Sequence, residues 1–178
     1  QRSKPISMSA TVALTGGTGF VGNAIARMLS EAGCKLRLLI RQPSAADRFR
    51  SMDAVTVHGS LSDRDSLARL LDGADWVVHA AGAIKAINAE QFVEVNRDGA
   101  ARIAEAAAGA EVNGFVLVSS LAARSPLVSA YARSKRMGES EVMSRLSRAV
   151  VLRPPVVYGP GDRETLPMFR AARYGYFL

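Results

Sequence analysis

The segment Thr15-Gly16-Gly17-Thr18-Gly19-Phe20-Val21-Gly22 decides how this chain folds. It follows the apolar run 11–14 and precedes apolar residues at helical spacing, so it joins a buried strand to a helix. The first glycine permits a tight turn, the second lets the backbone approach a pyrophosphate, and the third allows close helix–strand packing. The helix N-terminus then presents free N–H groups and a partial positive charge to phosphates. The segment predicts a dinucleotide site formed by Gly16, Thr18, Gly19, Phe20, Val21 and Gly22.

Strand and helix patterns alternate along the rest of the chain. Apolar runs of strand length occupy 11–14, 35–40, 55–58, 75–79, 115–119 and 149–152. Helical patterns cover 20–32, 62–71, 89–108, 130–146 and 166–173, and Gly33 is placed to end the first helix. This order predicts an α/β fold with a doubly wound parallel sheet of the Rossmann type. We expect one NAD(P)-binding domain over residues 10–178, preceded by a disordered tail or tag remnant at residues 1–9.

Composition narrows the classes of function. The 178 residues are 48% apolar and 22% charged, which is typical of a soluble globular domain. The net charge is +7, but the arginines are scattered and aromatic residues are few, so nucleic acid is not an expected partner. No apolar run is long enough to span a bilayer. The single cysteine, Cys34, fits a reducing compartment such as the cytoplasm. His58 and His79 lack neighbouring ligands at metal-binding spacing, so no metal site is expected.

The end of the second expected strand bears on the choice of cofactor. NAD-binding folds usually place a carboxylate there, about 20 residues after the glycines, to accept the ribose 2′-hydroxyl. This chain has Arg41 at that point and no carboxylate before Asp47. A guanidinium suits a 2′-phosphate, so Arg41 favours NADP(H) over NAD(H). The alternative is that Arg41 is an ordinary solvated loop residue.

Ser120, Tyr131 and Lys135 form a candidate catalytic group. Tyr131 and Lys135 lie four residues apart in an expected helix, so both side chains project from one face. A lysine ammonium beside a phenol lowers the tyrosine pKa and prepares it for proton exchange with a hydroxyl or carbonyl. Ser120 follows the fifth expected strand, at the sheet edge where such folds bind ligands. The group predicts acid–base chemistry at a substrate oxygen.

Together these segments resemble the extended short-chain dehydrogenases/reductases, the NAD-dependent epimerase/dehydratase family. The resemblance covers residues 11 to about 170 and rests on segments 15–22, 79–82, 95–99, 118–120, 131–135 and 152–161, in the family's order. It implies that Tyr131 is the acid/base, Lys135 its partner and a ligand of the nicotinamide ribose, and Ser120 a donor to the substrate oxygen. Asn96 would have a structural or proton-relay role.

The same resemblance implies further cofactor contacts. Ala80, Ala81 and Gly82 would line the adenosine side and middle of the cofactor, and Pro154, Pro155 and Val156 would pack against the nicotinamide. Two positions depart from the family pattern. Ser60, followed by Leu61, replaces the usual acidic contact to adenine, and Ala100 replaces a frequent threonine. The first departure puts adenine recognition in doubt.

We therefore expect an NAD(P)-dependent oxidoreductase acting on a small-molecule alcohol or carbonyl, with an NADP-dependent ketone reductase favoured. The alternatives are an NAD-dependent nucleotide-sugar epimerase/dehydratase and a non-catalytic NAD(P)-binding module. Family members place most of the substrate subdomain after the loop near Gly159, so this chain is expected to be truncated and to have little turnover by itself. The helices at 89–108 and 130–147 are a possible homodimer surface.

Overall fold

A computed structural model describes residues 9–175 and contains one parallel sheet of six strands. The strand order β3-β2-β1-β4-β5-β6 confirms the expected doubly wound topology. The strands are β1 (Thr11–Thr15), β2 (Lys35–Ile40), β3 (Val55–His58), β4 (Trp76–His79), β5 (Gly114–Val118) and β6 (Val150–Leu152). Residues 1–8 of the expected tail and the apolar end 176–178 lie outside the described residues.

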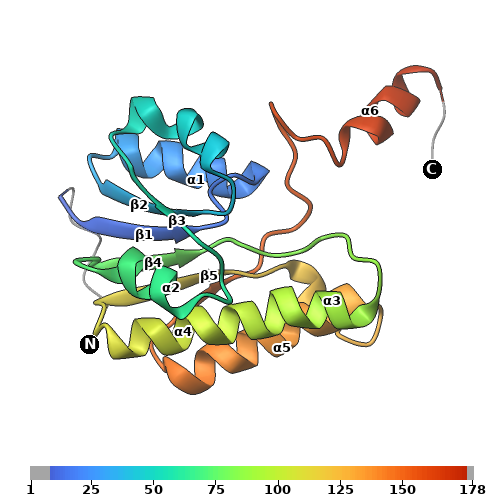
Figure 1. Cartoon of the computed structure of the whole chain (residues 1–178). Coiled ribbons are helices and arrows are strands. Elements are labelled where there is room, and N and C mark those ends of the chain that lie inside the picture. Colours follow the sequence, from blue (N-terminus) through green and yellow to red (C-terminus); the bar gives the residue numbers. More distant parts are fainter. Residues whose placement is uncertain (1–8, 176–178) are drawn as a thin grey trace.

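Helices cover both faces of the sheet, as Figure 1 shows. One face carries α1 (Phe20–Glu31) and the 3-10 segment η1 (Pro43–Met52), and the other carries α2 (Arg64–Leu71), α4 (Gly99–Gly109) and α5 (Ala130–Arg145). Three short elements complete this body: α3 (Ala89–Val93), the π-turn η2 (Glu94–Asp98) and the 3-10 turn η3 (Leu121–Arg124). The final helix, α6 (Leu166–Arg173), extends away from the body in Figure 1. No helix within residues 9–175 is long and apolar enough to cross a membrane.

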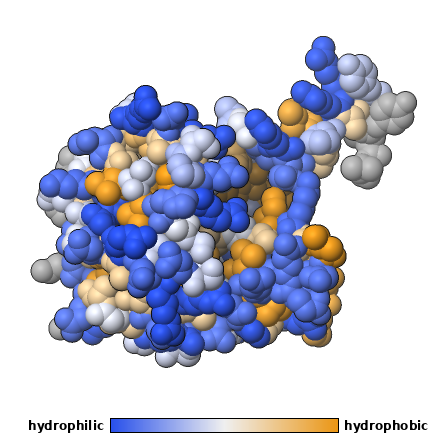
Figure 2. All heavy atoms as spheres, in the orientation of Figure 1, coloured by the Kyte–Doolittle hydropathy of each residue, from blue (hydrophilic) through white to orange (hydrophobic). Residues whose placement is uncertain are grey.

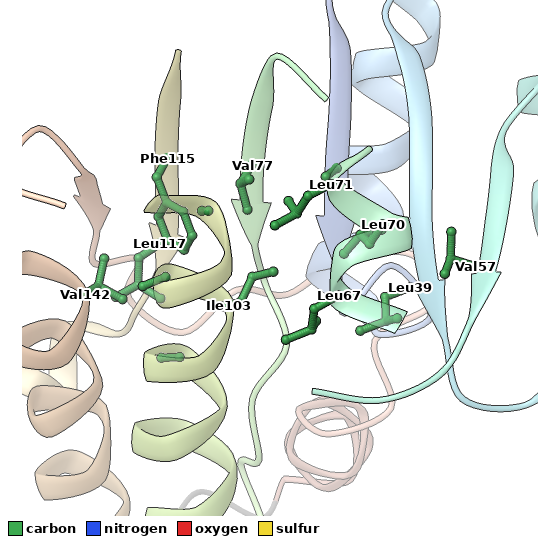
Figure 3. Packing of buried hydrophobic residues seen from close by; sticks show 14 residues of the cluster. Leu39, Val57, Leu67, Leu70, Leu71, Val77, Ile103, Phe115, Leu117 and Val142 are labelled. Carbon is green, nitrogen blue, oxygen red and sulfur yellow. The ribbon is translucent and has the colours of Figure 1, made fainter. Parts of the chain in front are cut away.

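The core is divided by the sheet into two clusters. Along β1, Ala13 belongs to the cluster beneath α2, α4 and α5, whereas Val12 and Leu14 belong to the cluster beneath α1 and η1. Side chains of a strand alternate between faces, so a central strand needs apolar residues at every position. Figure 3 shows the first cluster, in which Leu67, Leu70 and other side chains of the helices meet the strands. Burial on both faces explains why the strands are continuous apolar runs in the sequence.

The expected helix at 89–108 runs without a break through α3, η2 and α4, so this prediction is confirmed. Its middle turn, η2, is a π-turn that the sequence did not indicate. The wider turn brings the Asn96 carbonyl oxygen against Gly138 of α5, so close that a Cβ at Gly138 would overlap it. The Asn96 side chain meanwhile holds the loop after β4. These contacts involve residues far apart in the sequence, which is why apolar spacing within 89–108 did not indicate the π-turn.

The segment η1 was also not predicted. Its sequence is polar and has no helical apolar period, yet Pro43 stands in its first turn and Phe49 is 1% exposed within the second core cluster. The buried Phe49 ring packs this segment against Gly17 of the glycine turn, where a Cβ would lie 3.6 Å from the ring.

Candidate functional site

The glycine turn between β1 and α1 forms a cradle that side chains would fill. Gly16 has a φ of 77°, and a Cβ there would lie 2.5 Å from the carbonyl carbon of Ala80. A Cβ at Gly22 would lie 2.7 Å from the carbonyl carbon of Gly16. Gly19 N donates to Gly16 O at 3.0 Å, which closes the turn directly before α1. The backbone is thus bare where a pyrophosphate would meet the helix N-terminus, so these residues fit a dinucleotide.

A cavity of about 300 Å³ opens beside this turn at the carboxyl ends of the strands. Nine of the sequence-predicted cofactor contacts line it: Gly16, Thr18, Gly19, Arg41, Ser60, Leu61, Ala80, Ala81 and Gly82. Its wall comes from the ends of β1, β2, β3 and β4, brought together because their carboxyl ends share one sheet edge. The sheet topology therefore assembles one site from segments spread over more than forty residues.

The remaining predicted contacts lie around the cavity without lining it. Phe20, Val21 and Gly22 form the first turn of α1. Lys135 and Tyr131 are on α5, and Pro154 and Val156 follow β6. Val156 is 71% exposed, and the Pro154 carbonyl accepts a hydrogen bond from Leu121 N at 2.9 Å.

Two arginines near the cavity were missed by sequence reasoning. Arg102 of α4 lines it together with Val95 and Gly99, and residues 95, 99 and 102 share one helix face. The spacing of Val95, Gly99 and Arg102 was the sequence signal that could have indicated Arg102 as a neighbour of the cavity. Arg48 of η1 donates to the Thr18 carbonyl at 3.3 Å, which puts a third guanidinium next to the glycine turn. Within residues 9–175, neither Arg41 nor Arg102 forms a side-chain ion pair. Glu94, an acidic residue, lines the same cavity.

Lys135 connects the helix α5 to this cavity. Its side chain is 8% exposed, and Nζ donates to the Val118 carbonyl at the end of β5 at 2.9 Å. A Cβ placed on Gly82, which lines the cavity, would lie 3.5 Å from Lys135 Nζ. Burial lowers the pKa of Lys135 to about 8, and the nearby Glu139 carboxylate opposes that shift. The ammonium is therefore held next to the cavity wall, and its lowered pKa lies not far above neutral pH.

Asn96 fixes the loop that carries Gly82. Its side-chain oxygen accepts from Ala83 N at 2.8 Å, and its amide nitrogen donates to Ala83 O at 3.0 Å. The amide also donates to Ser134 Oγ at 2.9 Å, which ties the loop to α5. All three bonds are satisfied by protein groups, so this geometry is a structural clamp on the loop after β4.

Tyr131 and Ser120 lie at the ends of neighbouring elements. Tyr131 is in the first turn of α5, half-buried, with its ring edge-on to Phe92 at 5.9 Å between centroids. Ser120 Oγ accepts from Ala122 N at 3.2 Å as the cap of η3. That bond uses a lone pair and leaves the hydroxyl hydrogen available to another acceptor. Both residues stand at the carboxyl-end edge of the sheet, where η3 packs against α5.

His79 is a buried neutral group beneath the site. Its Nδ1 is 2.6 Å from Thr15 Oγ1, across the paired ends of β1 and β4. Burial, with a smaller contribution from the Lys135 charge, lowers its pKa to about 3. His79 is 1% exposed, so it is part of the buried packing between β1 and β4 and stays uncharged at neutral pH.

Comparison with known proteins agrees with this geometry. The NAD dependent epimerase/dehydratase family matches residues 12–174. A ceramide reductase of Caulobacter vibrioides is 46% identical over 161 residues, covering 90% of this chain and 50% of the relative. The crystal structure of gox2253 has a TM-score of 0.82 at 30% identity, covering 94% of this chain and 58% of that one. The Bordetella bronchiseptica enzyme WbmH, solved with NAD+, has a TM-score of 0.79 at 25% identity, covering 94% and 64%. The chain thus spans about half the length of the curated relatives it matches.

Proposed function

The chain belongs to the NAD-dependent epimerase/dehydratase family, and from this premise we propose that it is the cofactor-binding and acid–base part of an NADP(H)-dependent ketone reductase. The observation that carries the proposal is the position of Lys135, whose ammonium reaches the cavity wall at Gly82 from the same helix as Tyr131. In this proposal the cavity lined by Gly82 binds the dinucleotide, and the adjacent pair Tyr131 and Lys135 transfers the proton. The similarity to a ceramide reductase supports reduction of a carbonyl over epimerisation of a sugar nucleotide.

The cofactor would supply hydride to the substrate carbon. In this proposal the bare turn at Gly16, Gly19 and Gly22 holds the pyrophosphate, and Ala80, Ala81 and Gly82 line the middle of the cofactor. Arg41, with Arg48 and Arg102 close by, gives the adenosine end three positive charges that suit a 2′-phosphate. The only carboxylate among the lining residues is Glu94. We therefore propose NADP(H) as the preferred cofactor.

The chain's own residues would handle the substrate oxygen. Tyr131 would donate its phenolic proton to the carbonyl oxygen, and the Ser120 hydroxyl would hydrogen-bond the same atom. The Lys135 ammonium would stabilise the phenolate that remains, because an adjacent positive charge favours the ionised phenol. Asn96 would keep the loop after β4 in place beside Lys135 through its three hydrogen bonds.

Exposed apolar side chains in two loops support an apolar substrate. Ile84 and Ile87 are 59% and 93% exposed in the loop after β4, and Leu127 and Val128 are 97% and 72% exposed just before α5. Figure 2 shows apolar side chains gathered over the side of the body where these two loops lie in Figure 1. A carbonyl compound with long aliphatic chains would bury such surface.

We also propose a homodimer that forms through residues 89–108 and 130–147. A cytoplasmic location is proposed as well.

The cofactor assignment is tested by calorimetric titration of NADPH and NADH into the wild type, Arg41→Ala and the control Arg27→Ala. Arg27 is an exposed arginine of α1 and does not line the cavity. A lost hydrogen bond to a charged group is worth about 1.5–3 kcal/mol, so Arg41→Ala should weaken NADPH binding about 10- to 100-fold and leave NADH nearly unchanged. Equal effects on both cofactors would contradict the NADP(H) preference.

The acid–base assignment is tested by Tyr131→Phe in the full-length protein that carries this chain. Turnover of a long-chain ketone should fall to background, whereas NADPH affinity should stay close to that of the wild type. Retained turnover would refute the role of Tyr131.

A further inference from the structure

A buried carboxylate lies one helical turn after Lys135 on α5. Glu139 of α5 is 2% exposed and accepts hydrogen bonds from three side chains. Ser119 Oγ donates to Oε1 at 2.6 Å, Arg153 donates through Nε and Nη2 at 2.8 and 2.6 Å, and Arg136 Nη1 donates to Oε2 at 3.1 Å. A charge this deeply buried and fully paired requires an exact local arrangement of its donors.

The donors belong to the segments that carry the reaction. Ser119 lies between Val118, whose carbonyl accepts from Lys135 Nζ, and Ser120. Arg153 directly precedes Pro154, whose carbonyl accepts from Leu121 N in the turn that Ser120 caps. Glu139 itself is one helical turn after Lys135. The carboxylate therefore ties the end of β5, the end of β6 and α5 to a single point.

Glu139 also balances the charge of Lys135. The titratable groups that interact with the Lys135 ammonium are His79 of β4, which is neutral, and Glu139. The bound arginines and Ser119 hold the pKa of Glu139 below its usual value although burial acts to raise it, so the carboxylate stays ionised. Glu139 raises the pKa of Lys135 and opposes the effect of burial.

We propose that Glu139 is a positioning residue for the Ser120–Tyr131–Lys135 group. It sets the geometry of Ser120 through Ser119, and its negative charge favours the protonated form of Lys135, without touching the substrate. This inference rests on the proposed function of the group. An ion pair that served stability alone would leave kcat and the pH dependence of turnover unchanged in the folded variant.

The first test is a titration that needs neither cofactor nor turnover. In protein labelled with 13C at the lysine side chains, the four lysines are few enough for the Lys135 signal to be assigned by its loss in Lys135→Arg. The pKa of Lys135 should fall by about one unit in Glu139→Gln, because a neighbouring opposite charge is lost. The control Glu141→Gln removes a carboxylate that pairs with Arg145 on the same helix, and it should leave the Lys135 signal unmoved. An unchanged pKa in Glu139→Gln would overturn the proposal.

The second test is kinetic, in the full-length protein. Glu139→Gln should lower kcat about tenfold and move the alkaline limb of the kcat profile about one unit to lower pH, since loss of a negative charge favours deprotonation of Lys135. Ser119→Ala keeps the charge and loses one hydrogen bond, so it should lower kcat without moving that limb. If Glu139→Gln folds poorly, Ser119→Ala still tests the proposal. A Ser119→Ala enzyme with the kcat of the wild type would overturn the claim that Glu139 sets the geometry of Ser120 through Ser119.

The failure of this inference differs from the failure of the proposed function. A wild-type protein that reduces no ketone, or a Tyr131→Phe variant that still does, refutes the proposed function. An active wild type whose kcat and pH profile survive Glu139→Gln refutes only the role of Glu139.

Discussion

Replacing Gly22 by alanine tests whether the glycine turn is as tightly packed as the structure indicates. Gly22 has an ordinary helical backbone, so the substitution introduces no strain in φ, and its effect comes from the added methyl group alone. That Cβ would lie 2.7 Å from the Gly16 carbonyl carbon and closer still to the carbonyl oxygen. Carbon atoms in comfortable contact are about 3.5 Å apart, so α1 and the turn must separate by roughly 0.8 Å or more.

The cost follows from what must move. Both clashing atoms belong to the backbone, and Gly16 O also accepts the hydrogen bond from Gly19 N that closes the turn. Inserting a methylene into a packed site costs typically 1–3 kcal/mol, and we expect a value of about 3 kcal/mol because no side chain can rotate away. For a chain of this size that lowers Tm by about 6 to 12 °C. NADPH binding should be lost with the turn geometry, because the pyrophosphate meets this backbone.

The matched control is Gly109→Ala at the end of α4. A Cβ there meets no heavy atom within 4 Å, and the residue has no positive φ. The free energy of unfolding of the Gly109→Ala variant should therefore rise by about 0.5–1 kcal/mol. Thermal unfolding followed by circular dichroism, with and without NADPH, measures both effects. If Gly22→Ala melts with the wild type and binds NADPH with the same affinity, the steric account of the glycine turn is refuted.

Three further predictions concern the supports of the site. The unfolded chain protonates His79 near pH 6.5, whereas the folded imidazole stays neutral down to about pH 3, so the free energy of unfolding should fall as the pH drops through this window, by up to about 1.4 kcal/mol per pH unit. His79→Gln should flatten this pH dependence when urea unfolding is measured at a series of pH values. An unaltered slope would count against the buried neutral His79. Asn96→Ala removes three hydrogen bonds and should lower the free energy of unfolding by about 2–3 kcal/mol in denaturant titrations. The backbone amide of Ala83 should exchange its hydrogen faster in this variant, and an unchanged exchange rate would contradict the clamp. Asp63→Ala removes the cap that accepts from Asp65 N and Ser66 N and should lower Tm by about 2 to 4 °C in calorimetry, whereas an unchanged Tm would mean that the cap is dispensable.

Much of the site was predictable because its residues follow local rules. The glycines of the turn, the strands that end at the cavity and the i, i+4 spacing of Tyr131 and Lys135 are all features of segments shorter than about fifteen residues. The expected cofactor contacts on the first four strands line one cavity because parallel strands place their carboxyl ends at one edge. Pro154 and Val156 do not line that cavity, and their expected contact with the nicotinamide stays a prediction.

Other features required the folded chain. The π-turn at Asn96 exists where α5 approaches at Gly138, and Arg102 becomes a cavity residue only when α4 packs beneath the sheet. Glu139 reads as an ordinary exposed helix position in a segment rich in charge, yet its partners come from β5 and β6. No spacing rule connects residues 119, 139 and 153.

The sequence by itself determined the parallel sheet, the glycine turn and the order of the candidate catalytic residues, because apolar periodicity and turn chemistry act over a few neighbouring residues. Only the tertiary structure decided that Lys135 is buried against Val118 and faces Gly82, and that Glu139 is buried among donors that follow β5 and β6. Burial and long-range hydrogen bonds set the charge states of such groups, and both arise only when distant segments pack together.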